Sequence, residues 1–148
     1  ENFTDALKHC EHALEIQLKL SSDIHPDLSA THFNLGRINL KLNQYNKALE
    51  HFQASQTIMT NISKEDHHDL ELLYFYIGNT YLLLGNYQKS IDNCEKSLRN
   101  QLKKPNSDKN HLATIYRCMG LAFNKLGKYV ESTKKFKKVL EIQSELQN

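Results

Sequence analysis

The hydrophobic positions of the chain follow a helical spacing. In residues 27–62, apolar side chains recur at intervals of three or four, first through Leu28, Leu35 and Leu42 and then again from Tyr45. This spacing is typical of amphipathic helices. The stretch therefore predicts two helices joined by a turn of two or three residues and packed antiparallel as a hairpin.

The same pattern returns at a fixed period. Gly36, Gly78 and Gly120 lie 42 residues apart, and tyrosines keep the same spacing at Tyr45, Tyr87 and Tyr129. A fixed period of this size indicates a stacked array of helical units. Glycine inside a helix costs roughly 1 kcal/mol relative to alanine. We therefore expect the partner helix to approach closely at each glycine, where the second helix carries a small residue: Ala48, Ser90 and Ser132.

The period places helix-ending residues between the two helices of each unit. Asn43, Gly85 and Gly127 occupy the same place, and asparagine or glycine is what a left-handed C-terminal cap requires. The predicted helices are 2–20, 27–42, 45–62, 69–84, 87–103, 111–126 and 129–146. The breaker residues fall in the connections 21–26, 63–68 and 104–110.

These elements predict an all-α protein, an α-solenoid of seven helices stacked as antiparallel hairpins. Three hairpins are complete, at 27–62, 69–103 and 111–146, and residues 1–20 form the second helix of a truncated repeat. Because that helix lacks its partner, we expect flanking repeats in a longer protein or end-to-end self-association.

The repeat resembles the tetratricopeptide repeat. The hallmark positions are matched by Leu35-Gly36, Ile77-Gly78 and Met119-Gly120, by Tyr81 and Phe123, by Gly85 and Gly127, and by Ala48, Ser90 and Ser132. The ordinary period of that family is 34 residues. The longer period, with His25-Pro26 followed by Asn34-Leu35-Gly36, is similar to the repeats of kinesin light chains.

The resemblance implies a superhelix whose first helices line a concave, peptide-binding groove. Side chains on the first helices that the core pattern does not use are the candidates for this groove: Phe33, Asn34, Arg37, Lys41, Phe75, Tyr76, Asn79, Arg117, Asn124 and Lys125. Amide groups can bind peptide backbone, and the resemblance gives that role to Asn34. The arginines and lysines favour an acidic partner.

Three functions stay open at this point. The leading one is a non-enzymatic adaptor that binds a peptide segment of a partner in the groove. The second is an architectural spacer or assembly segment of a larger complex, and the third is a regulatory sensor fused to an enzyme elsewhere. Any single arginine or lysine of this set is explained equally well as an ordinary solvated side chain on a helix surface.

Composition and motifs argue against several other classes of function. The net charge of +2 is too small to indicate nucleic acid or a membrane surface, and no apolar run reaches the roughly 20 residues of a bilayer span. No phosphate loop or nucleophile motif indicates catalysis or a cofactor. Cys10, Cys94 and Cys118 lack metal or redox spacing, so we expect no metal site and a reduced, cytoplasmic protein.

Overall fold

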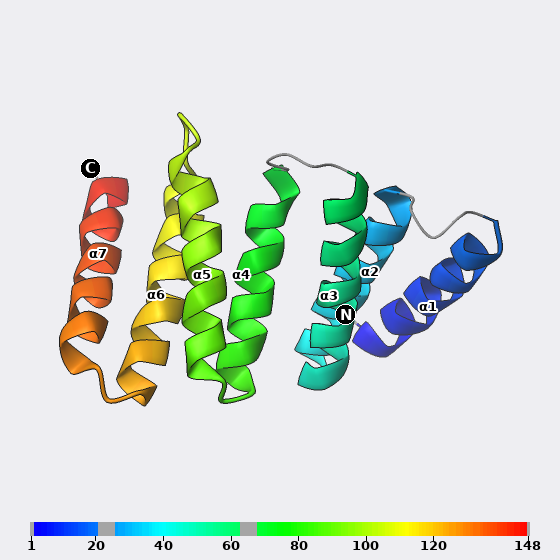
Figure 1. The fold of residues 1–148 in the computed structure, drawn as a ribbon, viewed down its shortest axis with the longest axis horizontal. Helices are drawn as coiled ribbons and strands as arrows, with labels where there is room; N and C mark the ends of the chain where they lie inside the picture. Colours follow the sequence, from blue (N-terminus) through cyan, green and yellow to red (C-terminus); the bar gives the residue numbers. More distant parts are fainter. Residues whose placement is uncertain (1, 21–25, 63–67, 148) are drawn as a thin grey trace. The chain divides into compact units, whose positions relative to one another are not determined.

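The computed structural model describes residues 2–20, 26–62 and 68–147, and these ranges contain seven α-helices (Figure 1). The helices are α1 (Phe3–Leu20), α2 (Pro26–Lys41), α3 (Tyr45–Ile62), α4 (His68–Leu83), α5 (Tyr87–Leu102), α6 (Lys109–Lys125) and α7 (Tyr129–Gln147). The predicted all-α fold is confirmed, and every helix end lies within two residues of its expected position. The predicted connections at 21–26 and 63–68 fall almost entirely outside the described residues.

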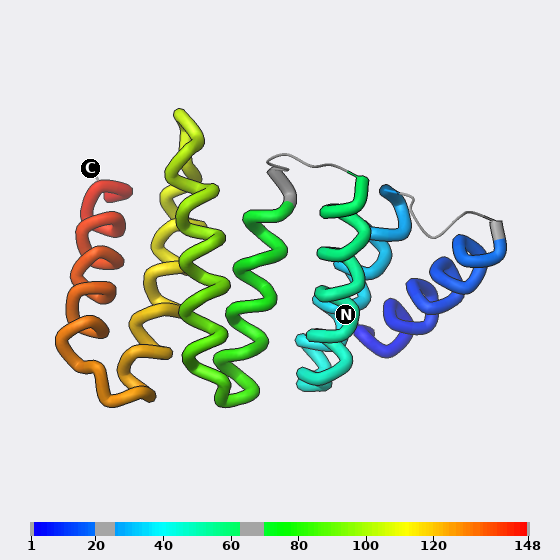
Figure 2. Tube along the Cα trace, in the orientation of Figure 1, coloured from blue at the N-terminus to red at the C-terminus, as the bar shows by residue number. Residues whose placement is uncertain are grey.

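The chain divides into two compact units, residues 1–76 and 77–148. In the first unit α2 and α3 form an antiparallel hairpin, and α1 packs against α2. In the second unit α6 and α7 form the equivalent hairpin, and α5 packs against α6. The tube in Figure 2 shows the tight reversal of the chain inside each of these hairpins.

Left-handed residues make the tight turns, as the sequence predicts. The φ angles are 59° at Asn43, 78° at Gly85 and 74° at Gly127. After α2, the backbone N–H of Gln44 donates to the carbonyl of Asn39 at 2.9 Å, and that of Asn43 donates to Leu40 at 3.1 Å. The same two bonds recur after α4 and α6. This pattern is the Schellman motif, which satisfies the last carbonyls of a helix.

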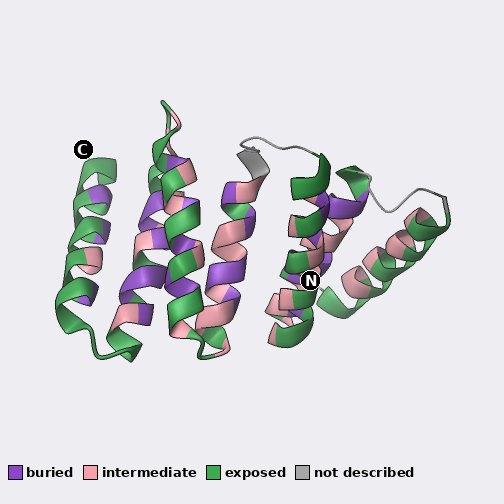
Figure 3. Ribbon diagram, viewed as in Figure 1, coloured by how far each residue is buried: buried purple, intermediate pink, exposed green. Residues whose placement is uncertain are grey.

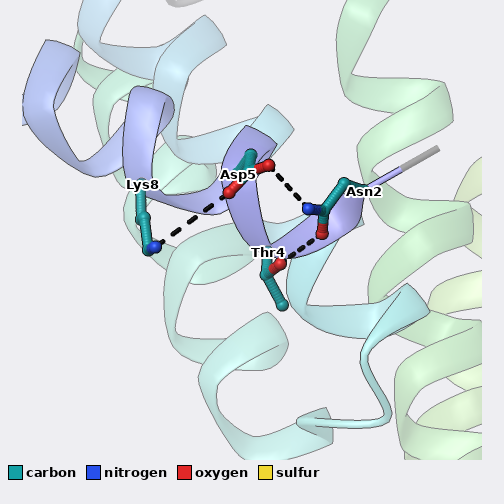
Figure 4. Close-up of polar contacts among 4 residues, drawn as sticks. All are labelled: Asn2, Thr4, Asp5 and Lys8. Carbon is teal, nitrogen blue, oxygen red and sulfur yellow. Dashed lines mark hydrogen bonds and ion pairs between the residues drawn. The ribbon is translucent and has the colours of Figure 1, made fainter.

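Polar side chains begin two of the helices. At the start of α1 (Figure 4), the Asn2 amide donates to the Asp5 carboxylate at 2.6 Å, Thr4 donates to the Asn2 side-chain oxygen, and Lys8 lies 4.0 Å from Asp5. Asp108 precedes α6, and its carboxylate accepts from the backbone N–H groups of residues 110 and 111. The Asp108 carboxylate thereby satisfies two backbone donors that have no partner inside the helix, whereas the contacts at α1 join side chains only.

Each unit has its own buried core. In Figure 3 the buried residues follow the helix faces that turn toward neighbouring helices within a unit. The largest fully buried side chains of the first unit are Leu35, Phe52 and Leu73, and those of the second include Ile115 and Met119. Leu35 belongs to the apolar spacing predicted for residues 27–62, and Met119 takes the same place two periods later. Leu73 and Ile115 share a place where the first repeat has Thr31, which that spacing did not include.

Each mid-helix glycine is contacted mainly by a residue larger than the alanine or serine that the sequence predicts at the contact. A Cβ added at Gly36 would lie 2.5 Å from Cε1 of Phe52, and one at Gly120 would lie 3.0 Å from the ring of Phe136. At Gly78 the nearest atom is Sγ of Cys94, at 2.8 Å. The small residues still contribute, because the Ser132 hydroxyl donates to the Gly120 carbonyl at 2.8 Å. Each glycine therefore makes room for the side chain one turn after the small residue.

This contact predicts that alanine at Gly36 destabilises the protein more than alanine at Gly120. Phe52 is 0% exposed and has no space to shift, whereas Phe136 is half-buried. Overpacking costs about 1–3 kcal/mol, against a gain of about 1 kcal/mol in helix propensity. We expect urea unfolding to show a net loss for Gly36→Ala and little change for Gly120→Ala. Equal losses, or the reverse order, would contradict the assigned contact.

Candidate functional site

A pocket of about 300 Å³ opens beside α1 and α2 in the first unit. Four of the ten predicted groove residues line it, namely Asn34, Arg37, Lys41 and Tyr76. The remaining lining residues are Phe3, Cys10, Ile38 and Leu40. The pocket therefore combines an amide, two cations and an aromatic ring with an apolar wall.

The helical period explains why three of these side chains meet. Asn34, Arg37 and Lys41 are separated by three and four residues, which places them on one face of α2. All three are exposed. The amide of Asn34 makes no hydrogen bond to any residue of the described ranges, so its donor and acceptor stay available.

The repeat also explains why a pocket lies here. Cys10 and Asn34 both line it, and one period later their places are taken by Phe52 and Tyr76. The Phe52 and Tyr76 rings stack with centroids 5.5 Å apart and an interplanar angle of 27°. A cysteine and an asparagine are much smaller than two aromatic rings. The space that the rings occupy in the later repeat is therefore left open between Cys10 and Asn34.

Aromatic rings hold the guanidinium of Arg37. Its central carbon lies 5.9 Å from the centroid of Phe33 and 5.8 Å from that of Tyr76, and the two rings meet edge to face at 5.3 Å. Cations within about 6 Å of a ring centroid are attracted by the ring quadrupole. In the part of the chain that the structure describes, no carboxylate pairs with Arg37 or Lys41. The two positive charges at the pocket are thus not neutralised there.

The two predicted phenylalanines are partly used for packing. Phe33 is half-buried and lies 5.8 Å from Phe52, and Phe75 is half-buried and lies 5.5 Å from Tyr76. Phe33 does not line the pocket of Arg37. It lines a second, mostly apolar cavity of about 250 Å³ together with Pro26, Ser29, Ala30, Ser55, Met59, Ile62 and Leu72.

The other four predicted residues belong to the second unit. Asn79 is half-buried on α4, and Arg117, Asn124 and Lys125 are exposed on α6. Arg117 and Asn124 are seven residues apart and share one face of α6. The structure thus gathers four candidates around one pocket in the first unit and leaves these four on the surface of the second.

Sequence reasoning missed Phe3 and Cys10 as pocket residues. Cys10 shares its place in the period with Phe52, Cys94 and Phe136, so the repeat pattern predicts a packing role for it and not a pocket. The available signal is a small residue at a place where two of the other three repeats carry phenylalanine. In the described ranges, no group of three or more histidine, cysteine or acidic residues could hold a metal ion, and no helix could span a membrane.

Comparison with known proteins decides the family. A family model described as tetratricopeptide repeat matches residues 1–61 and 69–145. The chain belongs to the tetratricopeptide repeat family. No curated protein matches the sequence significantly.

Several solved tetratricopeptide-like structures share the fold. BtubC (BKLC) from P. vanneervenii is 14% identical with a TM-score of 0.89, and the match covers 99% of this chain and 58% of that one. A putative kinesin light chain from Podosopora anserina with nearly identical TPR-like repeats is 20% identical, with a TM-score of 0.75 and coverage of 99% and 69%. MamA from Desulfovibrio magneticus RS-1 is 16% identical, with a TM-score of 0.74 and coverage of 99% and 70%.

These matches confirm the fold expected from the resemblance to kinesin light chain-type repeats. The chain spans about 58% of the length of BtubC. At such low identity the similarity concerns the fold alone, so the binding properties of this chain depend on its own side chains.

The pocket predicts selective labelling of one cysteine. Cys10 is half-buried at the pocket, whereas Cys94 and Cys118 are only 0% and 4% exposed. The pKa of the Cys94 thiol is also raised, chiefly by its hydrogen bond with Cys118 and further by burial. The same hydrogen bond lowers the pKa of Cys118, so burial alone protects that thiol from the reagent. We expect a thiol reagent to label about one thiol per native chain quickly and the other two at least ~10-fold more slowly.

The Cys10→Ser variant supplies the control for this labelling, because it should lose the fast phase and keep the slow one. Fast labelling of Cys94 or Cys118 in the native protein would contradict the packing of the second unit.

Proposed function

We propose that the chain is a non-enzymatic adaptor module that binds a peptide segment of a partner protein. Its tetratricopeptide family is generally one of protein–protein interaction modules, which supports the general class. The observation that carries the finer proposal is the face of α2 at the pocket. There an amide and two cations stand together without any described protein partner.

The chemistry of this face favours an extended peptide with an acidic residue. The Asn34 amide can pair with one peptide group through a donor and an acceptor. Arg37 is oriented by the rings of Phe33 and Tyr76 and can bind a carboxylate through two parallel hydrogen bonds. Lys41 adds a second positive charge one turn away. The apolar wall beside Cys10 would accept a neighbouring apolar side chain.

The remaining predicted residues extend this proposal to the second unit. Asn79, Arg117, Asn124 and Lys125 are the candidates of that unit for contacts with a partner protein. The family and the free state of all three cysteines support a protein partner and a cytoplasmic setting.

The acidic-peptide proposal predicts that reversing the charge of Arg37 weakens binding strongly. Peptides selected from a random display library on the wild-type chain should be enriched in aspartate and glutamate. In fluorescence anisotropy titrations, Arg37→Glu should reduce the affinity for the best peptide by roughly 10–100-fold, because charge-assisted hydrogen bonds contribute about 1.5–3 kcal/mol. Asn34→Ala should reduce that affinity by about 5–10-fold through the lost amide contact.

Lys137→Glu is the matched control, since it makes the same charge change on an exposed residue of α7 in the other unit. At about 0.15 M salt it should change affinity by less than ~2-fold, because an exposed charge that is not part of the proposed site is largely screened. Equal effects of the two charge reversals, or selected peptides without acidic residues, would refute the proposed site.

One observation favours an architectural role as the second candidate. On α7, Tyr129, Val130 and Leu140 are 67%, 66% and 65% exposed. Leu98 takes the place of Leu140 one period earlier, and it packs on the buried cluster of Leu112, Ala113, Val139 and Ile142. Among the described residues, no equivalent cluster packs against Leu140. An additional repeat or a second copy of the chain could provide such a cluster.

The architectural role predicts that the chain associates at high concentration through α7. Light scattering should then show oligomers that Leu140→Lys converts to monomers. Leu102→Lys serves as the control, because Leu102 is 57% exposed elsewhere in the same unit and its replacement should leave the oligomers intact. A wild-type chain that stays monomeric at high concentration would exclude this surface as a self-assembly site.

A further inference from the structure

Two histidine rings meet inside the hairpin of α2 and α3. Nδ1 of His32 lies 3.0 Å from Nδ1 of His51, and the ring centroids are 5.3 Å apart. His32 lies on α2, His51 lies on α3, and both side chains are half-buried. This contact therefore joins the two helices of the first complete hairpin.

The geometry limits the protonation states of the pair. An Nδ1–Nδ1 hydrogen bond needs one nitrogen as the donor and the other as the acceptor, so at least one ring must be neutral. A single added proton is compatible with the contact, since a charged ring can donate to the neutral one. A second proton would bring two N–H groups and two positive charges face to face at 3.0 Å.

The same places in the last hairpin hold residues other than histidine. Tyr116 corresponds to His32, and Lys135 corresponds to His51. Lys135 Nζ lies 5.7 Å from the centroid of Tyr116. That pair also connects the two helices of its hairpin, but it contains no imidazole, the side chain suited to a charge change near neutral pH. The first hairpin differs by having a proton-sensitive pair.

Burial lowers the pKa of both rings, and only at His51 do neighbouring carboxylates oppose it. The pKa of His32 is lowered, first by burial and then by the positive charge of His51. The pKa of His51 is also lowered by burial, which outweighs the opposing effects of Glu50 on α3 and Glu11 on α1, while Lys47 on α3 lowers it further. These three charged residues are the ones that the described helices direct at the pair.

We propose that the His32–His51 pair is a proton-sensitive joint of the α2–α3 hairpin. The joint holds while at least one ring is neutral and loosens when both rings carry a charge. Because α2 also bears Asn34 and Arg37, the joint acts on a helix that lines the pocket. The inference stands independently of peptide binding, since its readout is the stability and titration of the free protein.

The direction of the pH effect follows from proton counting. Histidine in the unfolded chain has its usual pKa of 6.5, and both folded values are lower. The unfolded state therefore binds more protons as the pH falls below 6.5, and stability decreases in that direction. Above that value both states carry neutral rings and the pair imposes no penalty.

The test compares the wild type with a variant that copies the last hairpin, His32→Tyr combined with His51→Lys. Thermal unfolding is followed at several values between about pH 7.5 and pH 5.5, with a chelator present to keep metal ions off the imidazoles. Over this pH range, the midpoint temperature of unfolding should fall by about 3 °C or more further for the wild type than for the double variant. His12→Asn, which removes an exposed histidine of α1, should behave as the wild type.

A direct measurement on the wild type keeps the test valid if the double variant does not fold. NMR titration of the two imidazoles should show coupled protonation, with a second step clearly below the usual 6.5. The proposal is overturned if both rings titrate independently at that usual value. It is also overturned if a folded double variant loses as much stability in acid as the wild type does.

Discussion

The close contact between a mid-helix glycine and a side chain of the partner helix sets the geometry of each hairpin. A Cβ at Gly36 or Gly78 would come within 3 Å of Phe52 or Cys94. Because glycine leaves this space free, the partner helix can bury its own side chain against the first helix. The helix propensity lost at each glycine is offset by that packing. The spacing of the glycines then repeats the hairpin along the chain.

The residues packed against the glycines also reach toward the next hairpin, and there the repeats differ. Phe52 stacks on Tyr76 and fills the space between α3 and α4, whereas Cys94 contacts Cys118 through its thiol. Cys10 and Asn34 occupy the equivalent places between α1 and α2 and line a pocket. Residue size at these two places does not by itself decide whether a junction is filled, because Cys94 and Cys118 are small and buried. The candidate binding face of α2 lies at the open one.

The sequence predicted the helices well because helix ends depend on local chemistry. Asn43, Gly85 and Gly127 each require a left-handed backbone, and the structure shows that conformation at all three. The contacts between helices were harder to predict, because they depend on side chains that are far apart in the sequence, 19 residues in the case of His32 and His51. The role of Cys10 in the pocket and the His32–His51 contact belong to this class. Comparing the same places across repeats would have marked the histidine pair as a departure from the pattern, but not Cys10, which recurs as Cys94.

The Cys10→Phe variant tests most directly whether the open junction is the binding site. Phenylalanine at this place copies Phe52 and should fill the pocket with little loss of thermal stability. Titration with a peptide selected on the wild type should then show affinity reduced by at least ~10-fold, and thiol labelling should lose its fast phase. A stable Cys10→Phe protein that binds the peptide as tightly as the wild type would contradict the account.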